Sequence, residues 1–139
     1  MSFWLFKSEP EKWSWSDQLR KGSVGESWDG IRNFQASNNM KSMKIGDLGF
    51  FYHSSKEKKI IGIVKVIKEY YPDYTDETGR FGMVDIVAIK ATVNQVSLKD
   101  IKQKEDLKDI CLIKQGRLSV LSISDNEWEI ILKMSETNI

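Results

Sequence analysis

The sequence predicts a single α+β domain built on a mixed or barrel-like β-sheet. Short runs rich in β-branched and aromatic residues alternate along the chain with segments that begin with helix-capping residues. No repeat, low-complexity tract or long linker divides the chain. Its 139 residues lie in the usual size range of one domain, so we expect residues 1–139 to share one core.

A strand and a short helix are expected near the N-terminus. Residues 3–7 combine aromatic and aliphatic side chains and predict a strand, which ends before Pro10. Ser14 and Asp17 have the spacing of a capping box, in which each side chain bonds the backbone N–H of the other residue. This pair predicts a helix that begins there and runs through Leu19.

A second helix, over about residues 31–43, carries carboxamides where a core helix usually carries aliphatic side chains. Gln35 and Asn38 share one face with Phe34, whereas Met40 lies on roughly the opposite side. Both sides are therefore expected to be at least partly buried. Because a buried amide without a partner costs about 1 to 3 kcal/mol, these amides should bind either neighbouring backbone or a ligand.

The middle of the chain predicts three strands. Residues 48–54 follow a turn and carry aromatic side chains on both faces of a strand. Residues 60–68 are dense in β-branched side chains and are close enough to the preceding strand to form a hairpin with it. An irregular excursion is expected over residues 70–82, before a further strand over residues 83–93.

The C-terminal third predicts two helices and one more strand. A capped helix is expected over residues 97–102, and a short strand over residues 118–121. Ser124 and Glu127 form a capping box that opens the last helix. Its apolar side chains, Trp128 among them, recur at helical spacing and should face the core.

The charges nearly balance, with 21 Lys and Arg against 20 Asp and Glu and a formal net charge of +1. Bulk charge therefore drives no strong nucleic-acid binding, and any such contact must be local. Lysines cluster within residues 56–59 and again within residues 99–108, but acidic residues interleave with both runs. This pattern favours a solvated surface of mixed charge.

The residue types argue against metal binding and catalysis. One His and one Cys cannot supply the ligands of a zinc site, and no glycine-rich loop follows a strand, so we expect no metal and no cofactor. Cys111 cannot form an intrachain disulfide, and its apolar neighbours suggest an inert core thiol. His53 and the adjacent Ser54 should point to opposite faces of a strand, which disfavours a hydrolytic triad.

No segment has the features of a signal peptide, and none approaches the roughly 18 apolar residues of a membrane span. We therefore expect no membrane partner and, by default, a cytoplasmic location.

The five tryptophans are unevenly placed, because four of them fall in the first fifth of the chain. Burial in the core explains Trp4 and Trp128. Trp13, Trp15 and Trp28 stand among polar residues and glycine, so some of these indoles are expected to line a cleft.

Four separate motifs occur in the order of the EVE domain family, which the chain resembles over essentially its whole length. They occupy residues 7–10 (KSEP), 28–36 (WDGIRNFQA), 51–54 (FYHS) and 115–120 (QGRLSV). The resemblance implies a PUA-like fold, a pseudo-barrel of mixed strands flanked by helices. It also implies kinship with the YTH and ASCH domains, whose members bind modified bases in RNA, and with EVE modules that read modified cytosine in DNA.

The resemblance also implies roles for individual residues. Lys7 and Ser8 match the edge of the family's pocket, Trp28 its stacking tryptophan, and Arg117 the basic residue of its last motif. Asn33, Gln35 and Asn39 are expected to read the edge of a base. The full set of expected base-binding residues is Lys7, Ser8, Trp28, Asn33, Gln35, Asn39, His53, Ser54 and Arg117.

The chain departs from the family pattern in two places. The loop over residues 71–81 is short where that of the family is often long and proline-rich, and Phe81 stands where the family often has Trp. YTH relatives have a second cage tryptophan after the central hairpin, whereas this chain has none between Trp28 and Trp128. The candidates for the opposite wall of the pocket are His53, Trp13, Trp15 and Phe81.

These features together predict a noncatalytic module that recognises a modified nucleobase of RNA or DNA in an aromatic pocket. Two alternatives stay open: a regulatory or protein-interaction module that binds a small anion or peptide in the same cleft, and a hydrolase of a modified nucleotide. Base selectivity retained at high salt would favour the reader over the anion binder, and turnover of a nucleoside would favour the hydrolase.

Overall fold

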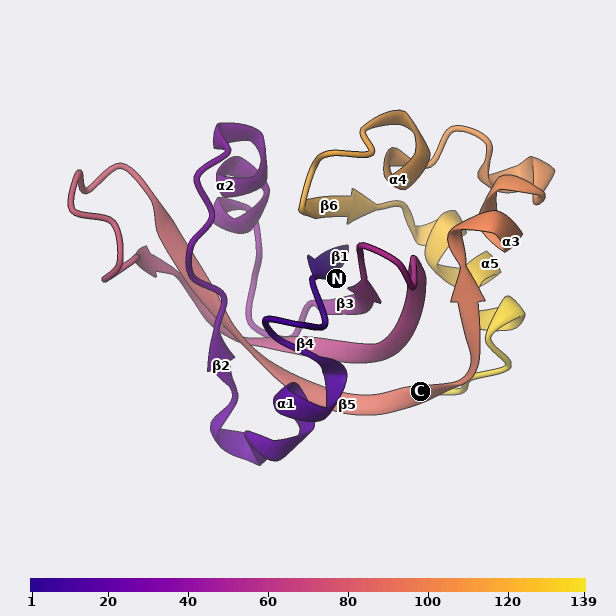
Figure 1. Cartoon of the computed structure of the whole chain (residues 1–139), viewed down its shortest axis with the longest axis horizontal. Helices are drawn as coiled ribbons and strands as arrows, with labels where there is room; N and C mark the ends of the chain where they lie inside the picture. Colours follow the sequence, from indigo (N-terminus) through magenta and orange to yellow (C-terminus); the bar gives the residue numbers. More distant parts are fainter.

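Six strands form one mixed sheet in the computed structural model, which covers residues 1–139 (Figure 1). The strands are β1 (Phe3–Ser8), β2 (Glu26–Ser27), β3 (Leu48–His53), β4 (Lys59–Pro72), β5 (Gly82–Ser97) and β6 (Val120–Ile123). They lie in the order β2-β5-β4-β3-β1-β6, with β1 parallel to β3 and every other pair antiparallel. The predicted α+β class and mixed sheet are confirmed. The sheet does not close into a barrel, because β2 and β6 remain separate edges.

Five α-helices surround the sheet, and no helix has the length and apolar character that crossing a membrane requires. The helices are α1 (Trp15–Arg20), α2 (Phe34–Lys41), α3 (Leu98–Lys102), α4 (Cys111–Lys114) and α5 (Asp125–Met134), with 3-10 turns η1 (Gly22–Val24) and η2 (Glu105–Leu107). The capping boxes predicted at Ser14 and Ser124 begin α1 and α5, and a further capping box at Ser97 begins the predicted capped helix α3. Both 3-10 turns, α4 and the short strand β2 have no counterpart among the predicted elements.

The hairpin of β4 and β5 is longer than predicted, because pairing continues through Tyr71 with Met83 and Pro72 with Gly82. The irregular excursion is therefore limited to a tip over residues 73–81. Several register shifts interrupt the pairing of the two strands, and such bulges increase local bend and twist. Figure 1 shows the result, a long curved ribbon that sweeps under the smaller strands.

Helix α2 begins at Phe34 and not at residue 31, because Asn33 takes an extended conformation and its side chain accepts a hydrogen bond from the Ala36 N–H at 3.0 Å. Only the side that carries Ala36 and Met40 is buried. Gln35 is exposed, and Phe34 retains 59% of its exposure. The expectation that both sides of this helix are buried was wrong.

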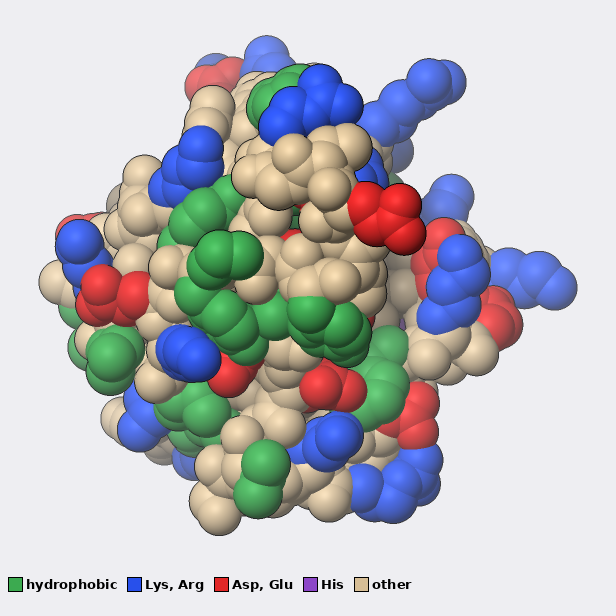
Figure 2. All heavy atoms as spheres, turned by 90° about the vertical axis from the view of Figure 1, so that its left-hand side faces the viewer, with side chains coloured by type: hydrophobic (Ala, Val, Ile, Leu, Met, Phe, Trp, Pro, Cys, Tyr) green, Lys and Arg blue, Asp and Glu red, His purple; other side chains and the backbone are tan.

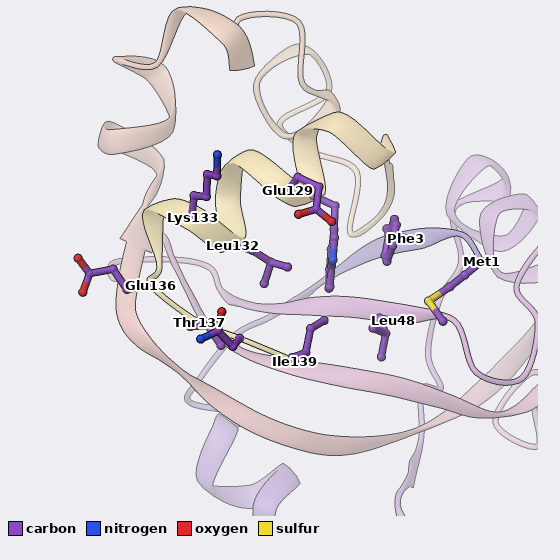
Figure 3. A pocket seen from close by; sticks show the side chains of 11 residues that line it. Met1, Phe3, Leu48, Glu129, Leu132, Lys133, Glu136, Thr137 and Ile139 are labelled. Atoms are coloured by element: carbon purple, nitrogen blue, oxygen red, sulfur yellow. The ribbon is translucent and has the colours of Figure 1, made fainter.

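The core contains one continuous set of apolar side chains from the sheet and the helices packed on it. At one end of the core, the Trp128 indole of α5 stacks between Phe3 and Phe50, with ring centroids 4.4 Å and 4.1 Å away. The predicted burial of Trp4 and Trp128 is confirmed. Between α5 and the starts of β1 and β3 lies a groove of about 680 Å³, and Figure 3 shows Phe3, Leu48, Leu132 and Ile139 around it.

The Trp15 ring packs directly against Gly62 of β4 and so anchors α1 to the sheet. A side chain at position 62 would collide with the indole. A Cβ atom at Gly62 of β4 would lie 2.4 Å from the Trp15 ring. We predict that Gly62→Ala destabilises the protein by about 1 to 3 kcal/mol, because the indole must move from its site. Gly116→Ala is the control, since no atom lies within 4 Å of the added Cβ. Equal denaturant midpoints for the two variants would contradict this account.

Candidate functional site

A cleft of about 390 Å³ opens between the end of β1 and the segment that follows β2. It is lined by Lys7, Ser8, Glu9, Lys12, Trp13, Glu26, Ser27, Trp28, Asp29 and Ile31. Three of the expected base-binding residues, Lys7, Ser8 and Trp28, meet here. Of the four candidates for the opposite wall, only Trp13 joins them.

Trp28 belongs to the core as much as to the cleft. Its indole meets the rings of Phe6 and Phe51 edge to face, at centroid distances of 5.4 Å and 5.9 Å. Only 8% of the residue is exposed, and its backbone N–H donates to the Val84 carbonyl at 2.7 Å. Trp28 therefore presents a small part of its surface to the cleft, and its position is fixed by the core.

Trp13 is less buried and is held in place by a chain of hydrogen bonds. Its Nε1 donates to Oε1 of Gln18 at 3.0 Å. Gln18 is fully buried in α1, and its Nε2 donates to the Ile86 carbonyl of β5 at 3.1 Å. These bonds hold the Trp13 ring in a fixed position at the wall of the cleft.

Ser8 can offer a ligand only an acceptor. Its side chain is buried at the cleft, and its hydroxyl donates to the Trp13 carbonyl. A hydroxyl has one proton and two lone pairs, so the oxygen remains able to accept a hydrogen bond. A ligand group that meets Ser8 should therefore carry an N–H, such as an exocyclic amine.

Lys7 brings positive charge to one end of the cleft. Its ammonium donates to the Gly116 carbonyl at 2.6 Å. Burial lowers the pKa of Lys7 below its usual value, and the nearby Cys111 opposes that shift. Cys111 itself is partly buried, which raises the pKa of its thiol and disfavours the reactive thiolate.

Asp73, at the tip of the β4–β5 hairpin, holds the cleft segment that carries Trp28. Its fully buried carboxylate accepts from the Gly30 N–H at 2.8 Å and from Arg32 Nη1 at 3.2 Å. It also accepts from the Thr75 N–H and hydroxyl at 2.7 Å and 2.6 Å. Burial alone would raise the pKa of Asp73, but these hydrogen bonds outweigh it and lower the pKa.

Sequence reasoning missed Asp73, which fell within the excursion predicted to be irregular. The available signal was the repeated Asp-X-Thr pattern at Asp73 to Thr75 and Asp76 to Thr78, which is typical of turns closed by side-chain to backbone hydrogen bonds. The face formed by α2 and this hairpin tip also gathers hydrophobic side chains (Figure 2). Phe34 and Tyr74 are exposed, and Phe34 contacts Phe81 at a centroid distance of 4.8 Å.

The three carboxamides expected to read a base edge do not line the cleft. Asn33 caps α2, whereas Gln35 donates to the side chain of Gln115 at 2.6 Å. Asn39 donates to the Val120 carbonyl at 2.8 Å. These bonds tie α2 to the last strand and the turn before it. Their placement does not support the predicted role as edge readers in this cleft.

His53, Ser54, Trp15 and Phe81 also lie outside the cleft lining. His53 Nε2 accepts from the Trp15 N–H at 3.0 Å, so its proton resides on Nδ1, which donates to Glu57 at 3.0 Å. The Ser54 N–H donates to the Ser8 carbonyl at 2.9 Å. His53 and Ser54 therefore position the end of β3 beside the cleft.

Arg117 lines a smaller, adjacent hollow of about 200 Å³ with Asn33, Gln35, Gln115 and Leu118. The Lys7 bond to Gly116 connects this hollow to the cleft. Arg117 is exposed, and no carboxylate lies within 4.0 Å of its guanidinium. Its charge is thus free to meet an anion. No cluster of three or more potential metal ligands occurs in the structure.

The open mixed sheet, with an indole-lined cleft at the end of its parallel strand pair, defines a PUA-like α+β domain. The chain belongs to the EVE domain family, whose family model matches residues 2–134. It is 34% identical to chicken (Gallus gallus) thymocyte nuclear protein 1, over 96% of this chain and 68% of that protein.

Solved structures agree with this assignment. A protein from Agrobacterium tumefaciens, 45% identical, superposes with a TM-score of 0.95 over 97% of this chain and 93% of that one. The human THYN1 protein, crystallised in complex with DNA containing 5-methylcytosine, is 31% identical, with a TM-score of 0.93 and full coverage of both chains. A YTH domain from Zygosaccharomyces rouxii, 15% identical, has a TM-score of 0.59, so the two share a fold.

We predict that Asp73→Asn destabilises the protein by about 2 kcal/mol at pH 7, because the amide replaces only one of the two acceptor oxygens and its NH2 group would face donors at the other. Asp73 has a lowered pKa in the folded state. It therefore contributes stability above its unfolded pKa, near 4, and loses that contribution as the pH falls through its folded pKa. The gap in unfolding free energy between the wild type and Asp73→Asn should narrow below about pH 4.

Asp106→Asn is the matched control, since Asp106 is exposed and forms no ion pair. It should leave the unfolding free energy unchanged at pH 7. A gap between the wild type and Asp73→Asn that is independent of pH would mean that the carboxylate charge of Asp73 does not hold the cleft segment.

Proposed function

We propose that this protein is a noncatalytic reader of a modified nucleobase, which it accepts into the cleft between Trp13 and Trp28. The observation that carries the proposal is the meeting of two indoles, a buried hydroxyl and a cation in one cleft. One relative with a matching fold, human THYN1, was crystallised in complex with DNA containing 5-methylcytosine. A methylated cytosine in DNA is therefore the first ligand to test.

The size and chemistry of the cleft suit a single base. Its volume of about 390 Å³ lies within the roughly 300 to 1,000 Å³ of ordinary ligand pockets. A base in a duplex must leave the stack to enter such a pocket, at a cost of a few kcal/mol. Stacking on an aromatic side chain returns about 1 to 3 kcal/mol. The anchored indole of Trp13 is suited to supply that stacking.

The acceptor at Ser8 sharpens the choice of base. The Ser8 hydroxyl already donates its proton to the Trp13 carbonyl, so in a hydrogen bond with a ligand the ligand must be the donor. Cytosine and adenine carry an exocyclic amine, whereas thymine presents a carbonyl oxygen at the matching position. A carbonyl oxygen that faces the Ser8 oxygen would make no hydrogen bond. The cleft should therefore favour a base that bears an amine.

Lys7 and Arg117 are suited to bind the phosphates that flank the base. Both are cations beside the cleft, and Arg117 has no competing carboxylate. Phosphate contacts of this kind position a nucleic acid without reading its sequence. Selectivity would then reside in the cleft, and general affinity at its rim.

Trp13→Ala should weaken binding to DNA with a central 5-methylcytosine by about tenfold or more, the equivalent of the lost stacking. Fluorescence anisotropy with short single-stranded probes that carry 5-methylcytosine, cytosine or thymine at the centre measures this loss. The wild type should bind the 5-methylcytosine probe most tightly and the thymine probe least.

Trp13→Phe is the matched variant. Both substitutions remove the Nε1 hydrogen bond to Gln18, but only Trp13→Ala removes the aromatic face. Trp13→Phe should thus retain most of the affinity and the order of the three probes. Equal losses for the two variants would rule out stacking, and equal binding of the three probes by the wild type would rule out a reader of 5-methylcytosine in DNA.

Arg117→Ala should lower the affinity for the cytosine and 5-methylcytosine probes by the same factor. It should also reduce the slope of log affinity against log salt by about 0.7, the value for one phosphate contact on a single strand. The melting temperature should not change, because Arg117 is exposed and forms no ion pair. An unchanged salt slope would exclude the phosphate contact.

A further inference from the structure

Two lysine runs that are about 40 residues apart in the sequence meet beside α3 in a hollow of about 530 Å³. The lining residues are Lys56, Glu57, Lys58, Ser97, Leu98, Lys99, Lys102 and Gln103, and we call this site the lysine hollow. The Leu98 N–H donates to the Lys58 carbonyl at 2.8 Å, which fixes α3 against the turn between β3 and β4. Figure 1 shows α3 at the far end of β5, where that strand curves up toward this turn.

The four lysines of the hollow form no ion pairs. No carboxylate lies within 4.0 Å of their ammonium groups, which is also true of other exposed lysines such as Lys44, Lys65 and Lys133. The carboxylate of Glu57 bonds to His53, and that of Asp100 accepts from the Ser97 N–H. The predicted mixed-charge surface is present here, since Glu57 lines the hollow, but its acids bond to partners other than the four lysines.

The turn that carries the lysine hollow is joined to the cleft through the end of β3. Ser8 lines the cleft, and its carbonyl accepts from the Ser54 N–H at 2.9 Å. Lys56 follows only two residues later, and two residues of extended chain span at most about 7 Å. The backbone of Lys56 is therefore close to the cleft lining, within the reach of an extended nucleic-acid strand whose base occupies the cleft.

The backbone at Lys58 points to a reason for lysine at that position. Lys58 has φ of 50°, in the left-handed region that favours glycine or asparagine. Strained backbone of this kind tends to persist where a function requires the side chain. At Lys58 the side chain supplies one of the four charges of the hollow.

We propose that the lysine hollow binds the phosphate backbone of the nucleic-acid segment that flanks the base held in the cleft. This proposal rests on the proposed reader function. Flexible ammonium groups without competing carboxylates bind phosphates irrespective of sequence, because binding releases the counterions condensed on the nucleic acid. The hollow thus extends the footprint of the protein along the strand and adds affinity without adding base selectivity.

The test compares a triple variant, Lys56→Gln, Lys99→Gln and Lys102→Gln, with the wild type on single-stranded DNA of 6 and 16 nucleotides. Each probe carries one central 5-methylcytosine or cytosine. The triple variant should bind the 16-nucleotide probes roughly tenfold more weakly, and its salt slope should fall by about 2, from about 0.7 for each lost contact. The affinity for the 6-nucleotide probes and the preference for 5-methylcytosine should be preserved.

The matched control is Lys44→Gln, Lys65→Gln and Lys133→Gln, which removes the same charge from exposed lysines outside the hollow. This control should change the salt slope much less than the hollow variant does. Equal slopes for the two triple variants would overturn the lysine hollow and leave the reader intact. If the wild type shows no preference for 5-methylcytosine, the reader fails, and the slopes still decide whether the hollow binds phosphate.

Lys58→Gly separates folding from binding at this site. Glycine relaxes the left-handed backbone at Lys58, so the melting temperature should stay equal or rise. The salt slope on the 16-nucleotide probes should nevertheless fall by about 0.7. An unchanged slope in a stable Lys58→Gly protein would count against the role of this lysine.

Discussion

The functional surface depends on the contacts that the buried Phe51 ring makes with neighbouring aromatic side chains. This ring is fully buried and meets those of Trp15, Trp28 and His53, at centroid distances of 5.3, 5.9 and 5.7 Å. Phe6 lies opposite Phe51 in the parallel pair of β1 and β3, and its ring also contacts Trp28. One aromatic cluster thus fixes α1, the cleft segment and the end of β3.

Most of the features proposed to bind nucleic acid lie in these segments or next to them. The end of β1 and the turn before α1 supply Ser8 and Trp13, and the turn after β3 begins the lysine hollow. On the other side of the cleft, Asp73 of the hairpin tip holds the segment that carries Trp28 through its bond with the Gly30 N–H. The rigid core therefore orders the rim, so that a bound base meets groups that are already in position.

The parts of the fold that could be predicted have local signals. Capping boxes at Ser14, Ser97 and Ser124 fix helix starts within four residues of chain, and β-branched density marks the central strands. The open sheet could not be predicted, because closure depends on pairing between distant edges. The start of α2 was also missed, because the periodicity of residues 31–43 concealed the cap at Asn33.

The site was predictable only in part. Lys7, Ser8 and Trp28 came from the resemblance to the EVE family, and they do meet in one cleft. Asn39 reaches a carbonyl 81 residues away, so its real partner has no signature in the neighbouring sequence. The lysine hollow likewise has no local sequence signal. Residues 56–58 and 99–102 become neighbours only when α3 packs on the β3–β4 turn.

The most direct test of the base site is fluorine NMR of protein labelled with 5-fluorotryptophan, because the chain has five tryptophans in distinct surroundings. Single substitutions to Phe assign the five signals. On titration with DNA that carries one 5-methylcytosine, the account predicts that the signals of Trp13 and Trp28 shift, while those of Trp4 and Trp128 stay fixed. Shifts at Trp4 or Trp128, with Trp13 and Trp28 unmoved, would contradict binding in this cleft.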